Sequence, residues 1–145
     1  MNFWNFRDNL KSLTDEKITE IAIDVIDDNK AIKLNQDQLV KGYDSNGVEM
    51  PKYTKNTIRI KQEEGGYISP SGRIALKDKG DLFNDMKVFK EPDFMSIFST
   101  DKKYNLLIGR YGKDVFGLTE KDSEITLKES NPRLIKKMQE ILTKW

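Results

Sequence analysis

The chain has 145 residues, and its 25 basic and 24 acidic side chains nearly balance, which is typical of one domain with a solvated, charged surface. It contains no cysteine, which excludes disulfides and thiolate metal sites, and no histidine, which removes the commonest general base and metal ligand. An enzyme with this sequence would have to use carboxylates, lysines, tyrosines or serines, which makes catalysis less expected, and we predict no metal and no cofactor.

The sequence also bears on location. No apolar run reaches the length of about 18 residues that indicates a membrane span. Residues 1–8 lack the apolar core of a signal peptide. We expect a protein that stays in the cytoplasm or leaves it only in an assembled particle. Acidic residues are in excess over residues 1–50 and basic residues over 51–110, a bipolarity compatible with head-to-tail association of copies.

The first 42 residues are expected to be helical. Residues 3–12 begin a helix, and apolar side chains at helical spacing predict another over 15–28, after Thr14 as the N-cap. The acids that end this segment oppose the helix dipole and are expected to stop it. Asn35 is expected to cap a short helix that Gly42 closes.

The middle of the chain is rich in turn signals. Asn46-Gly47 predicts a tight turn. Residues 57–61 alternate like a strand, yet Asn56 can equally cap a helix, so both interpretations stay open. Glycine, serine and proline bracket a loop over 65–72, and residues 79–85 are expected to form one or two helical turns.

A β-hairpin is predicted from residues 86–90 and 94–100, with Pro92 in the turn between them. Residues 102–110 are expected to be helical, with Leu106 and Leu107 facing inward. Thr119 is expected to start a short helix.

The C-terminal segment is predicted to form a helix of its own. Asn131-Pro132 has the pattern of an N-cap followed by proline, and an apolar stripe continues to Trp145. The sequence thus predicts an α+β fold in a single domain, 1–145, with residues 1–13 as a candidate N-terminal arm. An N-terminal helix precedes a central antiparallel sheet with a hairpin near 86–100, and helices follow.

Three patterns suggest site chemistry, and each has an ordinary structural explanation. Asp44 to Gly47 resembles a truncated calcium loop, but a surface turn explains it equally. Gly109 to Lys113 lacks the spacing of a phosphate-binding loop and is more typical of a helix end followed by a turn. Asp24, Asp27 and Asp28 resemble an acid–base set, but no apolar pocket is indicated to raise a pKa.

Two aromatic-containing segments have a binding interpretation. Lys52, Lys55, Arg59 and Lys61, with Tyr43 and Tyr53 nearby, suit contacts to a nucleic-acid backbone and bases, although a solvated face is the alternative because Glu63 and Glu64 follow. The cluster Phe3, Trp4 and Phe6 either covers the protein's own core or docks on a neighbouring subunit.

One ordered set of residues resembles a protein family. It comprises Gln38-Leu39; Gly42, Asp44 and Gly47; Tyr53, Thr57 and Lys61; Leu76, Asp78, Gly80 and Leu82; Tyr104; Tyr111-Gly112; and Phe116-Gly117-Leu118. With these residues, roughly 35–120 is similar to the tail-completion and virion-morphogenesis proteins of tailed bacteriophages, small α+β proteins of the head–tail junction. The chain departs from many relatives at Lys79, where they carry a hydroxyl residue, and in its lack of histidine after the hairpin.

The resemblance implies a structural protein of the virion without catalytic activity. It implies a homo-oligomeric ring between portal and tail, with portal or adaptor and tail proteins as partners, contact with packaged DNA as an option, and no membrane. Whether the ring is a neck, a tail terminator or another connector stays open. The candidate subunit-interface residues are Trp4, Tyr43, Tyr53, Thr57, Arg59, Lys61, Tyr111 and Phe116. The alternative function is a nucleic-acid-binding module that uses the basic segment 52–61.

Loops 43–56 and 62–75 are long for a compact domain, and long loops are usually functional or disordered. We expect them to become ordered against adjacent subunits or against the portal and tail proteins.

Overall fold

The structure is a computed structural model that describes residues 3–78 and 80–144. The elements are α1 (Phe3–Ser12), α2 (Asp15–Asp24), α3 (Asp28–Val40), α4 (Lys55–Glu64), α5 (Asp81–Asn84), β1 (Met86–Lys90), β2 (Met95–Ser99), α6 (Tyr104–Tyr111), the 3-10 helix η1 (Lys113–Val115) and α7 (Glu120–Leu142). The α+β class is confirmed. Outside the described part lie residues 1–2 of the candidate arm, Lys79 of the predicted helical turns, Trp145 of the predicted stripe and the side chain of Phe3.

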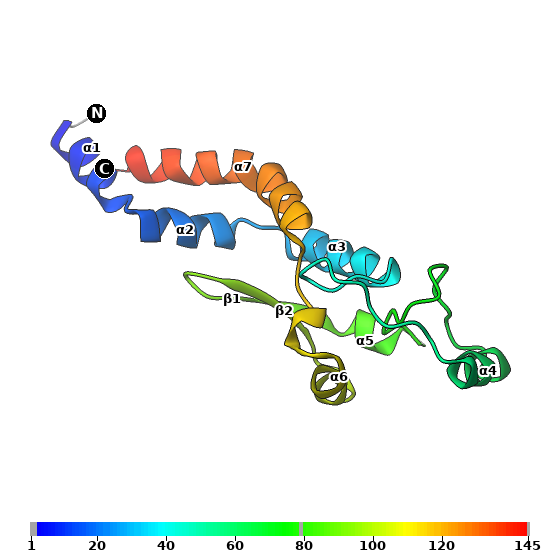
Figure 1. Cartoon of the computed structure of the whole chain (residues 1–145). Coiled ribbons are helices and arrows are strands. Elements are labelled where there is room, and N and C mark those ends of the chain that lie inside the picture. Colours follow the sequence, from blue (N-terminus) through cyan, green and yellow to red (C-terminus); the bar gives the residue numbers. More distant parts are fainter. Residues whose placement is uncertain (1–2, 79, 145) are drawn as a thin grey trace.

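The molecule is elongated (Figure 1). Helices α1 and α2 and the C-terminal part of α7 form one end, and α4 forms the other. The predicted hairpin is confirmed: β1 and β2 pair antiparallel, with Val88 opposite Ile97, and together they form the whole sheet within the described residues. The core lies where α3, α5, β1, β2 and η1 meet. It contains Ile26, Ala31, Leu39, Met50, Leu82, Phe83, Met86, Ile97, Val115 and Phe116.

The N-terminal helices differ from the prediction at their boundaries. Thr14 caps α2 as expected, with its hydroxyl accepting from the Lys17 amide at 3.2 Å. Helix α2 ends earlier than predicted, at Asp24, because Asp27 caps the next helix and accepts from the Lys30 amide. An acid near a helix end can equally begin the following helix.

The prediction that Asn35 caps a short helix is wrong. Asn35 lies inside α3 and is fully buried. Its amide nitrogen donates to the Gly117 carbonyl at 2.9 Å, and its oxygen accepts from the Gly117 amide at 3.3 Å. The end of this helix is as predicted, since Gly42 follows it with a φ of +89°.

The boundaries of α7 also differ from the prediction. Thr119 caps it as predicted, but the helix continues through Pro132 to Leu142, so the separate start at Asn131-Pro132 is wrong. A proline has the helical φ but no N–H, so it removes one backbone bond and often bends a helix. Figure 1 shows that α7 changes direction along its length. The bent helix stays continuous while it packs against α2.

The remaining ambiguities resolve in favour of helices. Residues 57–61 belong to α4, which Thr54 caps instead of Asn56, and Gly65 ends that helix with a φ of +72°. In α6, Leu107 packs against the core as expected, but Leu106 is 72% exposed, so its predicted inward position is wrong. Helix α1 contacts α7, and Asn9 donates to the Lys144 carbonyl at 2.6 Å. The described part of the candidate arm is therefore attached to its own chain.

Candidate functional site

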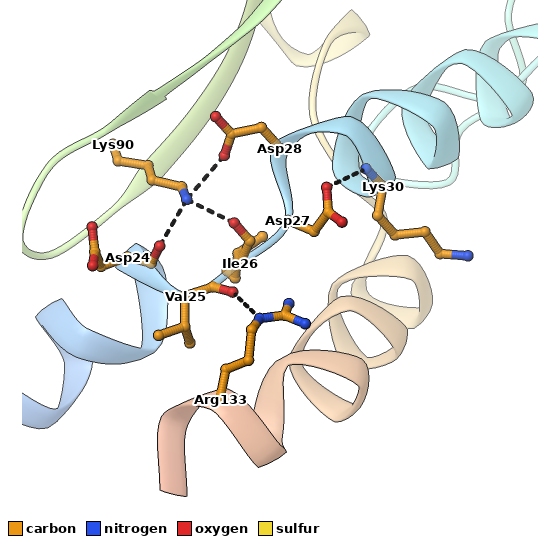
Figure 2. Close-up of polar contacts among 8 residues, drawn as sticks. All are labelled: Asp24, Val25, Ile26, Asp27, Asp28, Lys30, Lys90 and Arg133. Atoms are coloured by element: carbon orange, nitrogen blue, oxygen red, sulfur yellow. Dashed lines mark hydrogen bonds and ion pairs between the residues drawn. The ribbon is translucent and has the colours of Figure 1, made fainter. Parts of the chain in front are cut away.

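The acidic cluster at the α2–α3 junction has a structural role (Figure 2). Lys90 of β1 donates to the carbonyls of Asp24 at 3.1 Å and Ile26 at 2.7 Å, and its ammonium lies 2.9 Å from an oxygen of Asp28. From α7, the Arg133 guanidinium donates to the Val25 carbonyl at 2.9 Å. Two cations thus satisfy carbonyls at the negative end of α2. Every acid of the cluster has a backbone or ion-pair use here except the exposed carboxylate of Asp24, so the acid–base interpretation loses its support.

The Asp44 turn likewise uses its carboxylate on the backbone. One oxygen of Asp44 accepts from the amides of Asn46 and Val48, each at 2.9 Å. The predicted turn is confirmed, with Gly47 at a φ of +74°. Over residues 3–78 and 80–144, no group of three or more acidic side chains is placed to hold a metal ion.

A pocket of about 310 Å³ lies between α4, α5, α6 and the segments before α4 and α5. We call it the basic pocket. Its lining residues are Lys52, Tyr53, Thr54, Thr57, Lys61, Ile74, Leu76, Lys77, Asp78, Asp81, Leu82, Lys103, Leu107, Arg110 and Tyr111. The volume lies at the lower end of the range of about 300–1,000 Å³ that is usual for ligand pockets.

One wall of the basic pocket comes from α4 and the residue before its cap. Thr57 and Lys61 are four residues apart, a spacing that places them on one face of α4, and Tyr53 lies directly before the cap. The Thr54 hydroxyl fixes the start of the helix by accepting from the Thr57 amide at 3.1 Å. The Tyr53 hydroxyl accepts from the Ala75 amide at 3.3 Å, which holds its ring in the wall.

An ion pair joins this wall to the floor. The Lys61 ammonium lies 3.1 Å from an oxygen of Asp78 and 5.6 Å from the centre of the Tyr53 ring. A cation over an aromatic face is attracted by the negative face of the ring. Gly66 lies close to this ion pair: a β-carbon at Gly66 would be 2.5 Å from the same Asp78 oxygen. Close approach explains the glycine at this position.

The opposite wall is one face of α6. Lys103, Leu107, Arg110 and Tyr111 stand at the spacing of one helical face and all line the pocket. The Arg110 guanidinium lies 5.6 Å from the centre of the Tyr111 ring. Gly112 then ends the helix with a φ of +94°, so the interpretation of residues 109–113 as a helix end is confirmed.

The pocket combines cationic side chains around its rim with apolar side chains on its floor. Five cationic and two anionic side chains line it, a formal excess of three positive charges. Ile74, Leu76, Leu82 and Leu107 supply the apolar part. Leu76 has a φ of +56°, the left-handed conformation that side chains larger than glycine rarely adopt. Such strain costs about 1–3 kcal/mol and is concentrated at functional sites.

The structure brings four of the eight predicted interface residues together: Tyr53, Thr57, Lys61 and Tyr111 all line the basic pocket. The other four lie elsewhere. Arg59 is on an exposed face of α4, where it pairs with Glu63 at 3.6 Å. Tyr43 forms a backbone bridge with Glu49 and is 38% exposed. Trp4 of α1 is 60% exposed.

Phe116, the eighth candidate, is buried, whereas the prediction treated it as a surface residue. It is only 6% exposed in the core, and its ring lies 5.1 Å from that of Tyr104. The Phe116 side chain therefore packs in the core of its own chain and not among the exposed candidate residues.

The two long loops contact each other within one chain. Lys52 and Arg73 form an antiparallel bridge, and the Tyr53 amide donates to the Gly72 carbonyl at 3.0 Å. The Arg73 guanidinium donates to the Met50 carbonyl at 2.8 Å and lies 2.7 Å from Glu49. The two loops thus contact each other within one chain, and their ordering against adjacent subunits or the portal and tail proteins stays a prediction.

Sequence reasoning missed Lys77, Lys103 and Arg110 as site residues. The last two could have been found, because Lys103 and Arg110 are seven residues apart and share one face of the helix predicted over 102–110. Lys77 carries no local signal. Its ammonium lies 4.9 Å from the Tyr67 ring and 5.9 Å from the Phe83 ring, contacts that only the folded chain creates.

Comparisons with family models, with curated proteins and with solved structures found no match to this chain. Among the described helices, none combines the length and the apolar character needed to cross a membrane.

Proposed function

We propose that this protein is a structural subunit of a ring at the head–tail junction of a tailed phage, of the connector, neck or tail-completion class, without catalysis. Its partners would be copies of itself, a portal or adaptor, and tail proteins, and its location the virion. The observation that carries the proposal is the gathering, in the fold, of the residues behind the family resemblance, although they are scattered from Gln38 to Leu118 in the sequence.

One group of these residues forms a bonded scaffold. The Gln38 amide nitrogen donates to the Gly117 carbonyl, and its oxygen accepts from the Thr119 amide, both at 3.0 Å. Next to it, the Ser45 amide of the Asp44 turn donates to the Asp114 carbonyl at 2.8 Å. The turn is thereby fixed to the segment that precedes α7.

The other group lines the basic pocket. Its members are Tyr53, Thr57, Lys61, Leu76, Asp78, Leu82 and Tyr111. A pattern of turns matched by chance has no reason to converge on one bonded scaffold and one pocket. The convergence therefore supports a shared architecture.

Exposed apolar side chains at separate places support assembly. Trp4 and Leu10 are more than half exposed on α1, and Leu106 is 72% exposed on α6. A head-to-tail ring requires two different contact surfaces on each subunit.

Native mass spectrometry over a concentration series tests the proposal. We expect one closed oligomer with a fixed number of subunits, and detection of the same protein in purified particles by antibody. A monomer at every concentration, together with absence from particles, would exclude a ring subunit.

A second candidate function is nucleic-acid binding, favoured by the five cations and two tyrosines of the basic pocket. It predicts binding of a single-stranded oligonucleotide that weakens steeply as salt rises. Lys103→Ala should weaken this binding, whereas Lys55→Ala should not, because Lys55 lies outside the pocket lining. Equal effects of the two substitutions would argue against the pocket as the binding site.

A further inference from the structure

We propose that the basic pocket is the socket for the hairpin turn of a second copy of this chain, residues 91–94, with Phe94 as its apolar anchor. The inference rests on the proposed ring and identifies the contact that would build it.

The hairpin turn carries an exposed aromatic ring and lies beside acidic side chains, which complement the cationic pocket. Phe94 is 50% exposed, and Asp93 precedes it in the turn. The hollow between this turn and α2 is lined by Ser12, Thr14, Asp15, Glu16, Lys17, Thr19, Glu20, Pro92 and Asp93. It carries four carboxylates and one ammonium, a formal excess of three negative charges, equal and opposite to that of the basic pocket.

Both surfaces also have an apolar part of suitable size. An exposed phenylalanine can bury its ring on the floor of Ile74, Leu76 and Leu82, beside the rings of Tyr53 and Tyr111. Buried aromatic anchors surrounded by a polar rim dominate most protein interfaces. The lysines of the rim would then face Asp93, which precedes the anchor, and the other carboxylates of the hollow that Asp93 lines.

The positions of the two surfaces determine the type of assembly. The turn lies below α2 near one end of the molecule, whereas α4, which forms a wall of the pocket, lies at the other end (Figure 1). One chain therefore cannot place its own turn in its own pocket. A contact between two different patches is heterologous, and its repetition gives a ring if the rotation closes.

The turn is also held rigidly enough to act as an anchor. Lys90, directly before it, is bonded to the α2–α3 junction through the Asp24 and Ile26 carbonyls. On the other side, the Glu91 amide donates to the Phe94 carbonyl at 2.8 Å and closes the turn. A preorganised contact loses less conformational entropy on binding.

Charge exchange between two variants provides the test. The socket variant carries Lys103→Glu and Arg110→Glu, and the turn variant carries Glu16→Lys and Asp93→Lys. All four positions are exposed, and none of their side chains forms an ion pair within residues 3–78 and 80–144. Each variant alone should self-associate with a dissociation constant raised about 100-fold, because like charges then face each other.

The 1:1 mixture should recover assembly. The intact socket of the turn variant fits the intact turn of the socket variant, and the two exchanged surfaces are again opposite in charge. Native mass spectrometry of the mixture should show complexes that contain the two variants in equal numbers. A matched control with Lys128→Glu and Lys136→Glu on exposed positions of α7 should assemble like the unmodified protein.

A substitution without charge change tests the anchor separately. Phe94→Ala should weaken assembly strongly, and Phe89→Ala, at a side chain that is equally exposed on the same hairpin (48% against 50%), should not. Circular dichroism should show that all variants remain folded.

The outcomes separate the inference from the proposed function. If the unmodified protein is always a monomer, the ring itself fails. If it assembles but the charge and anchor variants assemble equally well, the ring stands and this contact is wrong. The inference is likewise overturned if the socket variant loses binding to a single-stranded oligonucleotide but keeps the oligomeric state of the unmodified protein. The pocket would then bind nucleic acid and not a second copy of the chain.

Discussion

Replacement of Lys90 by methionine should measure how strongly the hairpin is tied to the helical end of the molecule. The substitution keeps most of the aliphatic stem and removes the ammonium. That ammonium donates to the Asp24 and Ile26 carbonyls at 3.1 and 2.7 Å and pairs with Asp28 at 2.9 Å. Its removal leaves two carbonyls at the end of α2 without this donor.

The magnitude follows from these contacts. Hydrogen bonds to a charged group contribute about 1.5–3 kcal/mol each. The Lys90 side chain is 22% exposed and Asp28 53% exposed, so water can replace part of the interaction and the ion pair adds little. We expect the free energy of unfolding to fall by about 2–3 kcal/mol, which for a chain of this size lowers Tm by about 4–10 °C.

Urea unfolding followed by circular dichroism would measure the effect, with an unchanged dependence on urea concentration as a check on two-state behaviour. Lys87→Met, on the exposed face of the same strand, is the control and should change stability by less than about 0.5 kcal/mol. Asp28→Asn should reproduce only a small part of the loss, because both carbonyl bonds remain. Equal losses for Lys90→Met and Lys87→Met would refute the reasoning.

Three further predictions concern the backbone and the core. Gly42→Ala should destabilise by at least about 1 kcal/mol more than Gly47→Ala, because both have positive φ but only at Gly42 would the new β-carbon meet a neighbour, the Arg73 Cβ at 2.9 Å; equal urea midpoints would contradict this. Asn35→Leu should lower stability by about 2–3 kcal/mol by removing two buried bonds to the backbone, and a thermal melt unchanged by the substitution would refute it. Burial raises the pKa of the Tyr104 hydroxyl above its ordinary value of 10.0, so the folded protein holds this proton more tightly than the unfolded chain. Stability should therefore fall as pH rises above about 10, and Tyr104→Phe should fold normally at neutral pH and show a shallower fall in alkaline urea titrations; identical slopes would contradict the assignment.

The candidate site was partly visible in the sequence. The family resemblance groups Tyr53, Thr57 and Lys61, although residues 57–61 fit a strand or a helix equally, and the structure places all three in the basic pocket. Phe116 was misplaced because an aromatic residue between turn signals can be a surface contact or a core residue. Only the packing around its ring distinguishes the two.

Features that depend only on neighbouring residues follow from the local sequence. The Thr14 cap, the Asn46-Gly47 turn, the Gly42 helix end and the hairpin at 86–99 are all present, because the side chains that fix them lie within a few residues of the backbone they bond.

Tertiary structure decided where local signals conflict. Asn35 and Pro132 both carry helix-start signals, yet α3 and α7 run through them, because the long-range bond to Gly117 and the packing of α7 on α2 outweigh a local cap. It also decided the basic pocket, whose lining comes from residues 52 to 111. Spacing along a chain does not report distances between separate elements, so only the folded chain shows five cations around one apolar floor.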